Sequence, residues 1–267
     1  MNRSALICLM ILMLLGSCSR QKTGNTVIKG RMQDAGCRMQ DAGCRMQDAG
    51  CRMQDAGCRM ILLQELLLEG SANLDSVVPD AKGDFLFRLK PAETGLYILR
   101  LPKLAPLVLE LHPGDSVFVS GSFLSFPADV IITGSQASKD LQAFFKASAV
   151  NKSGFDSLEN ILITHQDDPD FAALTLKLDE SLKPIWEKQR ELEINYLNSH
   201  PVSLTSLLVL NHSLSLSPVL TFDLDSVYFL RLDSSLGKAF PGNQHAGFHH
   251  KRIIRARQLQ QSKEGSG

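Results

Sequence analysis

Apolar residues recur at every second position in several short segments between Met60 and Thr133, the pattern of strands with one buried face. In one of these segments, Phe85, Phe87 and Leu89 fall on the same face. Turn-forming residues separate the segments, as in the stretch His112-Pro113-Gly114-Asp115. About eight strands are expected in this span, which predicts that the β-rich domain, residues 26–134, is an antiparallel β-sandwich or an open barrel.

The spacing of apolar residues becomes helical after Ser135, whose side chain can cap the first helix. Leu141, Phe144 and Phe145 would share one face of that helix. Helical spacing continues almost to the C-terminus, so residues 135–262 are predicted to form an all-helical domain. Together with the β-rich domain over residues 26–134, this predicts an α+β fold.

Caps and prolines indicate the remaining helix boundaries. A second helix is expected to begin behind Ser153, and a long third helix at Asp168-Pro169. Pro201 is expected to stop the third helix and Pro184 to kink it. The last helices are expected over residues 204–210, 223–232 and 245–261.

The N-terminus has the pattern of an export signal. Arg3 supplies a positive charge, and Ala5 to Leu15 form an unbroken apolar run of 11 residues. That run is too short to cross a bilayer of roughly 30 Å as a helix, which is typical of a signal peptide. Leu15-Gly16-Ser17-Cys18 resembles the lipobox of bacterial lipoproteins, in which the cysteine is lipidated. A plain secretory signal with an incidental cysteine is the alternative.

These features predict a signal peptide over residues 1–17, a lipidated Cys18 and a tether over residues 18–25. Lipid chains would attach the protein to the membrane without a membrane-spanning segment. Ser19-Arg20-Gln21-Lys22 has no acidic run of the kind that resembles a surface-export signal. We therefore expect an outer-membrane lipoprotein of a Gram-negative bacterium that faces the periplasm.

A heptapeptide, Arg-Met-Gln-Asp-Ala-Gly-Cys, occurs four times without substitution in residues 31–60. A coiled coil is disfavoured because every heptad would contain a glycine, which costs roughly 1 kcal/mol in a helix. The unit favours strand, turn and strand, with Asp-Ala-Gly as the turn. Reduced to one copy, the segment would be a hairpin turn between a first strand near Val27 and a second strand near Ile61. The array is interpreted as an insertion in that loop.

Four of the six cysteines lie in the repeat, and none follows it. Six residues separate neighbouring cysteines, which does not match the spacing of zinc sites. In an oxidising compartment, disulfides around the turns are geometrically possible, and three pairings remain open. The candidate disulfide cysteines are Cys37, Cys44, Cys51 and Cys58.

The charges balance, with 28 basic and 28 acidic residues, so the chain has no overall field that favours nucleic acid. Three local groups of charged or metal-binding residues each allow two interpretations. Two histidines at helical spacing, with a third beside them, are metal ligands or part of a polar helix face. A basic run is a contact with anionic headgroups or a solvated helix end, and a group of acidic residues is an ion site or the start of a helix. No motif for a metal, a cofactor or catalysis is found. The groups are His245, His249 and His250; Lys251, Arg252, Arg255 and Arg257; and Asp167, Asp168 and Asp170.

Several short motifs occur in an order that resembles the N-terminal region of TlpA-type thioredoxin-family lipoproteins of the periplasm. They are Asp80–Phe87, Leu96-Tyr97, Pro113-Gly114-Asp115-Ser116, Gly134-Ser135, and Tyr196-Leu197 with His200-Pro201-Val202-Ser203. The resemblance covers roughly residues 26–262 and implies a β-rich domain of unknown function followed by a helical linker. In that family a redox domain with Trp-Cys-x-x-Cys comes next. This chain has no Cys-x-x-Cys, and residues 263–267 are interpreted as a truncated linker.

The sequence therefore favours a non-catalytic, lipid-anchored envelope protein that acts as the binding or scaffolding module of a thioredoxin-like redox lipoprotein. The alternatives are a truncated thiol-disulfide oxidoreductase, whose redox domain is lost or encoded downstream, and a repeat-variable surface protein. The expected partners are the membrane, through the anchor, and another envelope protein as a candidate. No nucleic acid, metal or cofactor is expected.

Overall fold

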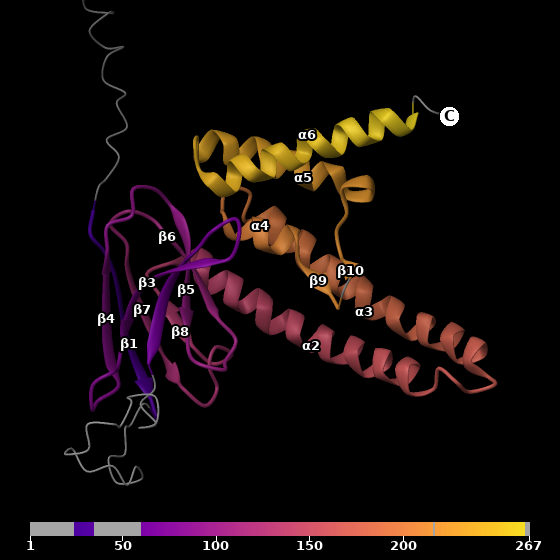
Figure 1. Cartoon of the computed structure of the whole chain (residues 1–267), viewed down its shortest axis with the longest axis horizontal. Helices are drawn as coiled ribbons and strands as arrows, with labels where there is room; N and C mark the ends of the chain where they lie inside the picture. Colours follow the sequence, from indigo (N-terminus) through magenta and orange to yellow (C-terminus); the bar gives the residue numbers. More distant parts are fainter. Residues whose placement is uncertain (1–23, 35–59, 216, 265–267) are drawn as a thin grey trace, which may run out of the picture.

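Two four-stranded sheets share one hydrophobic core in the computed structural model, which describes residues 24–34, 60–215 and 217–264 (Figure 1). Helices follow the sheets along the chain, so the predicted α+β fold is confirmed. The strands are β1 (Thr26–Gln33), β2 (Ile61–Leu66), β3 (Ser71–Val77), β4 (Asp84–Leu89), β5 (Gly95–Arg100), β6 (Leu107–Leu111), β7 (Ser116–Ser122) and β8 (Ile131–Thr133). Cys18 and the four repeat cysteines lie outside the described residues.

The strand order is β4-β1-β7-β8 in one sheet and β3-β2-β5-β6 in the other, and both sheets are open. All neighbours are antiparallel except β1 and β7, which run parallel with Ile28 opposite Val117. The purely antiparallel prediction is therefore wrong at this pair. Between β1 and β7 the chain forms the whole second sheet and β4, and this long connection lets β7 return in the same direction as β1.

The predicted hairpin between the first two strands is also wrong. β1 pairs with β4 and β7, whereas β2 pairs with β3 and β5, so the strands that flank the repeat belong to different sheets. Both strands bury one face: Ile28 and Met32 on β1, and Ile61 and Leu63 on β2. These faces meet across the sandwich rather than side by side. The position of the repeat, between the first two strands, is as expected.

Close packing within the β4-β1-β7-β8 sheet depends on a glycine in β1. Gly30 on β1 lies under the ring of Phe85, and a Cβ there would come within 2.2 Å of that ring and 2.4 Å of the carbonyl oxygen of Val119. No side chain fits at this position, so β1 can approach its two neighbours closely. Burial of the large residues in this core stabilises the sandwich by roughly 1.5–3 kcal/mol each.

The helical part consists of α2 (Gln136–Thr164), α3 (Phe171–Ser199), α4 (Thr205–Leu210), α5 (Phe222–Ala239) and α6 (Gln244–Glu264). Two-residue strands β9 (Ser213–Leu214) and β10 (Ser217–Pro218) form a small ladder between α4 and α5, so this part is not entirely helical. Ser135 caps α2 as predicted, because its side chain accepts a hydrogen bond from the Ser138 amide. The chain turns after His200, before Pro201, also as predicted.

The predicted helix break at Ser153 is wrong, because α2 continues through it to Thr164. The neighbouring Gly154 lies against Ile185 of α3, whose side chain would be 3.2 Å from a Cβ at this position. Packing against α3 thus keeps α2 helical where local sequence suggests a cap. The two helices project together as a long arm away from the sheets (Figure 1).

A second hydrophobic core joins the helices to the outer face of the β3-β2-β5-β6 sheet. Leu96 of β5 belongs to this core, whereas its neighbours Tyr97 and Leu99 belong to the core between the sheets. β5 is therefore buried on both faces and carries both cores. The helical members that are almost fully buried include Leu141, Leu197, Leu204, Val209, Leu210 and Leu236.

We predict that deleting Arg38 to Cys58, three of the four repeats, leaves the fold intact and raises the free energy of unfolding by about 1 kcal/mol. A shorter connection between β1 and β2 costs less closure entropy, and this cost changes only logarithmically with length. Urea denaturation of the two proteins measures the difference. A loss of stability would mean that the repeat contributes contacts to the fold.

Candidate functional site

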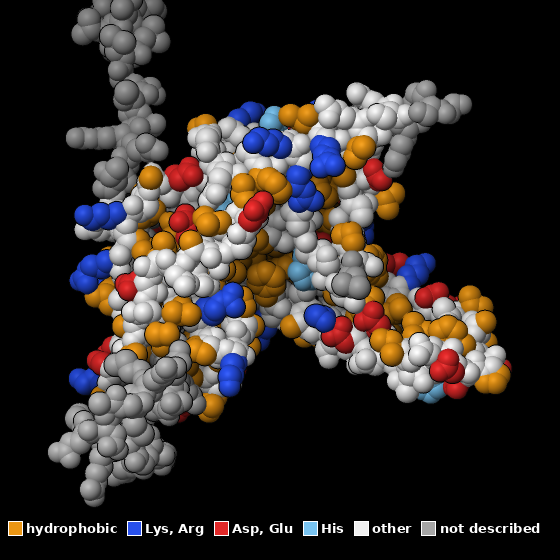
Figure 2. Space-filling model, viewed as in Figure 1, with side chains coloured by type: hydrophobic (Ala, Val, Ile, Leu, Met, Phe, Trp, Pro, Cys, Tyr) orange, Lys and Arg blue, Asp and Glu red, His pale blue; other side chains and the backbone are white. Residues whose placement is uncertain are grey.

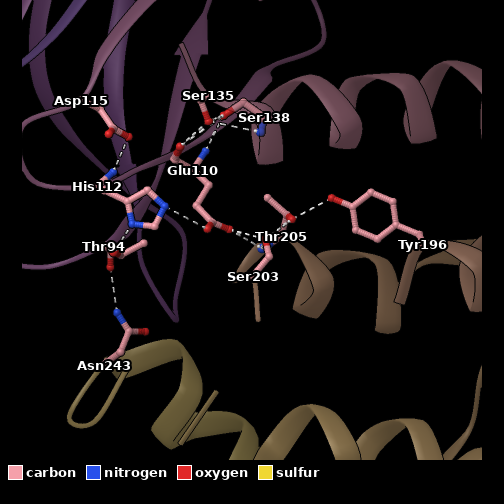
Figure 3. A network of polar contacts seen from close by, with 10 residues as sticks. All are labelled: Thr94, Glu110, His112, Asp115, Ser135, Ser138, Tyr196, Ser203, Thr205 and Asn243. Carbon is pink, nitrogen blue, oxygen red and sulfur yellow. Dashed lines mark hydrogen bonds and ion pairs between the residues drawn. The ribbon is translucent and has the colours of Figure 1, made fainter. Parts of the chain in front are cut away.

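A buried carboxylate joins the sheets to the helices. Glu110 of β6 is only 2% exposed, and its Oε2 accepts hydrogen bonds from the Ser203 hydroxyl at 2.6 Å and from the Thr205 amide at 2.9 Å (Figure 3). The Thr205 hydroxyl lies 2.7 Å from the hydroxyl of Tyr196 on α3. Hydrogen-bond donors therefore surround a charge that would otherwise be costly to bury.

The backbone of Glu110 is held by the start of α2. β6 is an edge strand, so one side of its backbone has no strand partner in the sheet. The Glu110 amide donates to Ser138 Oγ at 2.9 Å, and its carbonyl oxygen accepts from Ser135 Oγ at 2.9 Å (Figure 3). Two serines at the start of one helix thus satisfy the exposed edge of the sheet.

The network continues from Glu110 to the start of α6. Nε2 of His112 lies 3.7 Å from Glu110 Oε1, and its Nδ1 lies 2.7 Å from the Thr94 hydroxyl. The Thr94 carbonyl oxygen accepts a hydrogen bond from Asn243 Nδ2 at 2.9 Å. Asn243 also accepts from the His245 amide, so it caps α6. One set of contacts therefore runs from Tyr196 to Asn243 (Figure 3).

A polar pocket of about 520 Å³ opens where this network reaches the surface. It lies at one end of the sandwich, beside the segment that precedes β5 and under the first residues of α6. Thr94 and Asn243 of the network form part of its wall. Its functional groups are those of Glu65, Arg88, Lys90, Glu93, Thr94, Tyr97, Asn243 and His245.

Burial determines the state of two side chains in the pocket. Tyr97 is 5% exposed, and burial, with Glu65 and Glu93 nearby, raises its pKa to about 12. Burial lowers the pKa of His245, whose Nε2 lies 3.0 Å from the carbonyl oxygen of Leu66. Because a carbonyl oxygen only accepts, Nε2 carries the proton and Nδ1 of the neutral ring presents a lone pair.

The three histidines considered as metal ligands point to separate partners. His249 Nε2 lies 3.1 Å from the Phe229 carbonyl oxygen, whereas His245 is directed to Leu66. His250 lies 3.0 Å from a carboxylate oxygen of Asp233. His249 is also buried, so it does not lie on a solvated polar face. Within the described residues, no three His, Cys, Asp or Glu side chains could hold a metal ion together.

The two charged groups named from the sequence are both on the surface. Lys251, Arg252, Arg255 and Arg257 are exposed on α6, and Figure 2 shows basic side chains gathered over α5 and α6. Among them, Arg252 donates to Asn211 Oδ1 at 2.6 Å. Residues 167–170 are exposed in the turn between α2 and α3, at the tip of the arm.

A second buried carboxylate lies among the helices. Glu193 is fully buried; its Oε1 accepts from Gln189 at 3.0 Å and lies 2.9 Å from Nδ1 of His212. Burial raises the pKa of Glu193, while the contacts with His212 and Gln189 act in the opposite direction. The other ring nitrogen of His212 lies 3.2 Å from Ser148 Oγ. Ser148 is buried in the middle of α2, and none of these residues lines the polar pocket or the apolar groove described next, so the cluster has no opening to either cavity.

An apolar groove of about 440 Å³ lies between α2 and the loops before β6 and β8. Leu107, Leu141 and Phe145 form part of its wall. Gln142 donates hydrogen bonds to the carbonyl oxygens of Pro127 and Val130, which holds the loop before β8 on the helix. Of these two cavities, the polar pocket brings charged groups of both signs and a tyrosine hydroxyl together, so it is the better candidate for a binding site.

The sequence contained weak signals for both buried carboxylates. Glu110 interrupts the apolar run of residues 107–111, and Glu193 falls between apolar positions near the end of α3. A charged residue at a core position indicates either a partner or a site. The partners of Glu110 are 93 and 95 residues away in the chain, which no local pattern reveals.

No family model, curated protein or solved structure matches the chain. The resemblance to TlpA-type lipoproteins therefore rests on the sequence motifs alone. Among the helices in the described ranges, none has the length and apolar character needed to cross a bilayer.

We predict that Glu110→Ala lowers the free energy of unfolding by about 2–4 kcal/mol, because it leaves the Ser203 hydroxyl and the Thr205 amide buried without their acceptor. Glu69→Ala is the matched control: Glu69 is exposed, and a change within about 0.5 kcal/mol is expected. Urea denaturation measures both. Equal effects of the two substitutions would contradict the role given to Glu110.

Proposed function

We propose that the chain is a lipid-anchored, non-catalytic protein of the bacterial envelope that acts as a binding or scaffolding module. The observation that carries the proposal is the polar pocket between the sandwich and α6. Its walls come from both parts of the fold, and a buried hydrogen-bond network holds Thr94 and Asn243 in position. A pocket supported in this way is preorganised for a ligand.

The membrane part of the proposal rests on the leader and on Cys18. The described chain begins at Gly24, which packs against Gly114 in the turn before β7. Residues 18–25 can span at most about 28 Å when fully extended. A lipid on Cys18 would therefore keep this end of the sandwich close to the membrane surface.

A scaffolding role is supported by the arm formed by α2 and α3. Val150, Ile163 and Leu176 are large apolar residues whose side chains are more than half exposed on this arm. Covering these side chains by another protein would remove apolar surface from water, which favours association. Another envelope protein is thus the candidate partner.

We predict that Cys18→Ala abolishes labelling by radioactive palmitate and moves the protein out of the membrane fraction, because a single cysteine is the lipid acceptor. Cys37→Ala, a repeat cysteine, is the control and should leave both properties unchanged. Envelope proteins recovered by cross-linking should also depend on Cys18. Retention of palmitate by the Cys18→Ala protein would contradict the proposed anchor.

A further inference from the structure

The polar pocket opens at the end of the sandwich from which the tether leaves. Thr26, the first residue of β1, pairs with Leu89 and donates a hydrogen bond to the His112 carbonyl oxygen at 2.9 Å. Leu89 and Lys90 line the pocket, and His112 contacts its wall residue Thr94. If Cys18 is lipidated, as proposed above, the pocket lies on the membrane-proximal end of the protein.

One group of residues in the pocket consists mainly of hydrogen-bond acceptors. Glu65 on β2 lies directly opposite Tyr97 on β5, so the two side chains share a face. Glu93 is close enough to act electrostatically on both Tyr97 and His245. Nδ1 of His245 adds a lone pair, because its Nε2 is committed to Leu66. Two carboxylates, a hydroxyl and a ring nitrogen suit a ligand with several N–H donors, such as an ammonium group.

The Tyr97 hydroxyl adds a polar group to the pocket wall. The residue is 95% buried, its hydroxyl has no hydrogen-bond partner among the described residues, and the side chain lines the pocket. Gly95 leaves room for the ring, since a Cβ there would lie 3.3 Å from the hydroxyl oxygen. The hydroxyl oxygen is not among the enclosed atoms of the described residues that lack a partner, so it reaches the open pocket, where it can donate to or accept from a ligand.

Arg88 and Lys90 line the same pocket and carry the opposite charge. Neither of them forms an ion pair with Glu65, Glu93 or any other residue that the structure describes. Charges of both signs thus remain available in one cavity. Two cations suit a phosphate, which accepts several charge-assisted hydrogen bonds.

We infer that the pocket binds a zwitterion with a primary ammonium and a phosphate, of the phosphoethanolamine type. The ammonium lies at Glu65, Glu93 and Tyr97, and the phosphate lies at Arg88 and Lys90. The volume of about 520 Å³ accommodates such a headgroup. The headgroup can belong to a membrane lipid or to a soluble molecule, and the membrane-proximal position of the pocket favours the lipid.

Calorimetric titration of the full chain in detergent with O-phosphoethanolamine tests the assignment. We expect saturable binding, with much weaker binding of glycerol 3-phosphate, which has no ammonium, and of ethylamine, which has no phosphate. Tyr97→Phe removes only the hydroxyl and should weaken binding about three- to tenfold. Glu65→Gln with Glu93→Gln, and Arg88→Gln with Lys90→Gln, should each weaken it by more than about tenfold.

The matched control is Glu69→Gln, an exposed residue outside the pocket lining, which should bind like the unaltered protein. Thermal unfolding of each variant shows whether it is folded. Binding that is absent, that is equally tight for glycerol 3-phosphate, or that is unchanged in the folded pocket variants overturns the assignment.

Nanodiscs distinguish the two sources of the headgroup. Hydrogen exchange of residues 88–97 should slow when phosphatidylethanolamine is added to phosphatidylcholine discs, because the quaternary ammonium of choline has no N–H donor. Slowing by soluble phosphoethanolamine alone supports the same pocket with a soluble ligand. The calorimetric titration does not require lipidation, so a failure of the anchor at Cys18 and a failure of the pocket are seen separately.

Discussion

Burial of the Glu110 carboxylate is the constraint on which the arrangement of this protein depends. A carboxylate in a nonpolar interior is stable only when donors replace the water it has lost. For Glu110 the donors are Ser203, just before α4, and the first residue of α4, while two serines at the start of α2 satisfy the backbone of the same residue. The helices cannot move away from the sheets without leaving this charge unpaired, so Glu110 adds a polar tie to the apolar core around Leu96.

The shape of the polar pocket depends on the same hydrogen-bond network around Glu110. His112 extends the network from Glu110 to Thr94, and Thr94 holds Asn243 at the start of α6. The pocket wall is therefore fixed by contacts that begin in the buried junction and not by surface loops alone. Thr94 and Asn243 are held in place before any ligand arrives, which lowers the entropy cost of binding.

Much of the fold followed from local patterns. The eight strands of the sandwich, the Ser135 cap and the turn before Pro201 were readable because alternation, caps and prolines act within a few residues. Alternation shows which face of a strand is buried, but not which sheet the strand joins. This is why the hairpin of β1 and β2 and the antiparallel neighbour of β1 were predicted incorrectly. The predicted helix break at Ser153 is wrong because packing of Gly154 against Ile185 outweighs a local cap signal.

For the site, strand alternation places Glu65 and Tyr97 on inward faces. Their approach to His245 depends on the contact between His245 and the Leu66 carbonyl oxygen, two residues that are 179 positions apart in the chain.

Cooperative unfolding of the two parts is the most direct test of this account. Methyl NMR signals of Val119, between the sheets, and of Val209, in the helical core, can be followed through a urea titration of the full chain. The account predicts that both signals disappear with the same midpoint, because the junction at Glu110 and the apolar core around Leu96 make the sheets and the helices one cooperative unit. Two separate midpoints would contradict it.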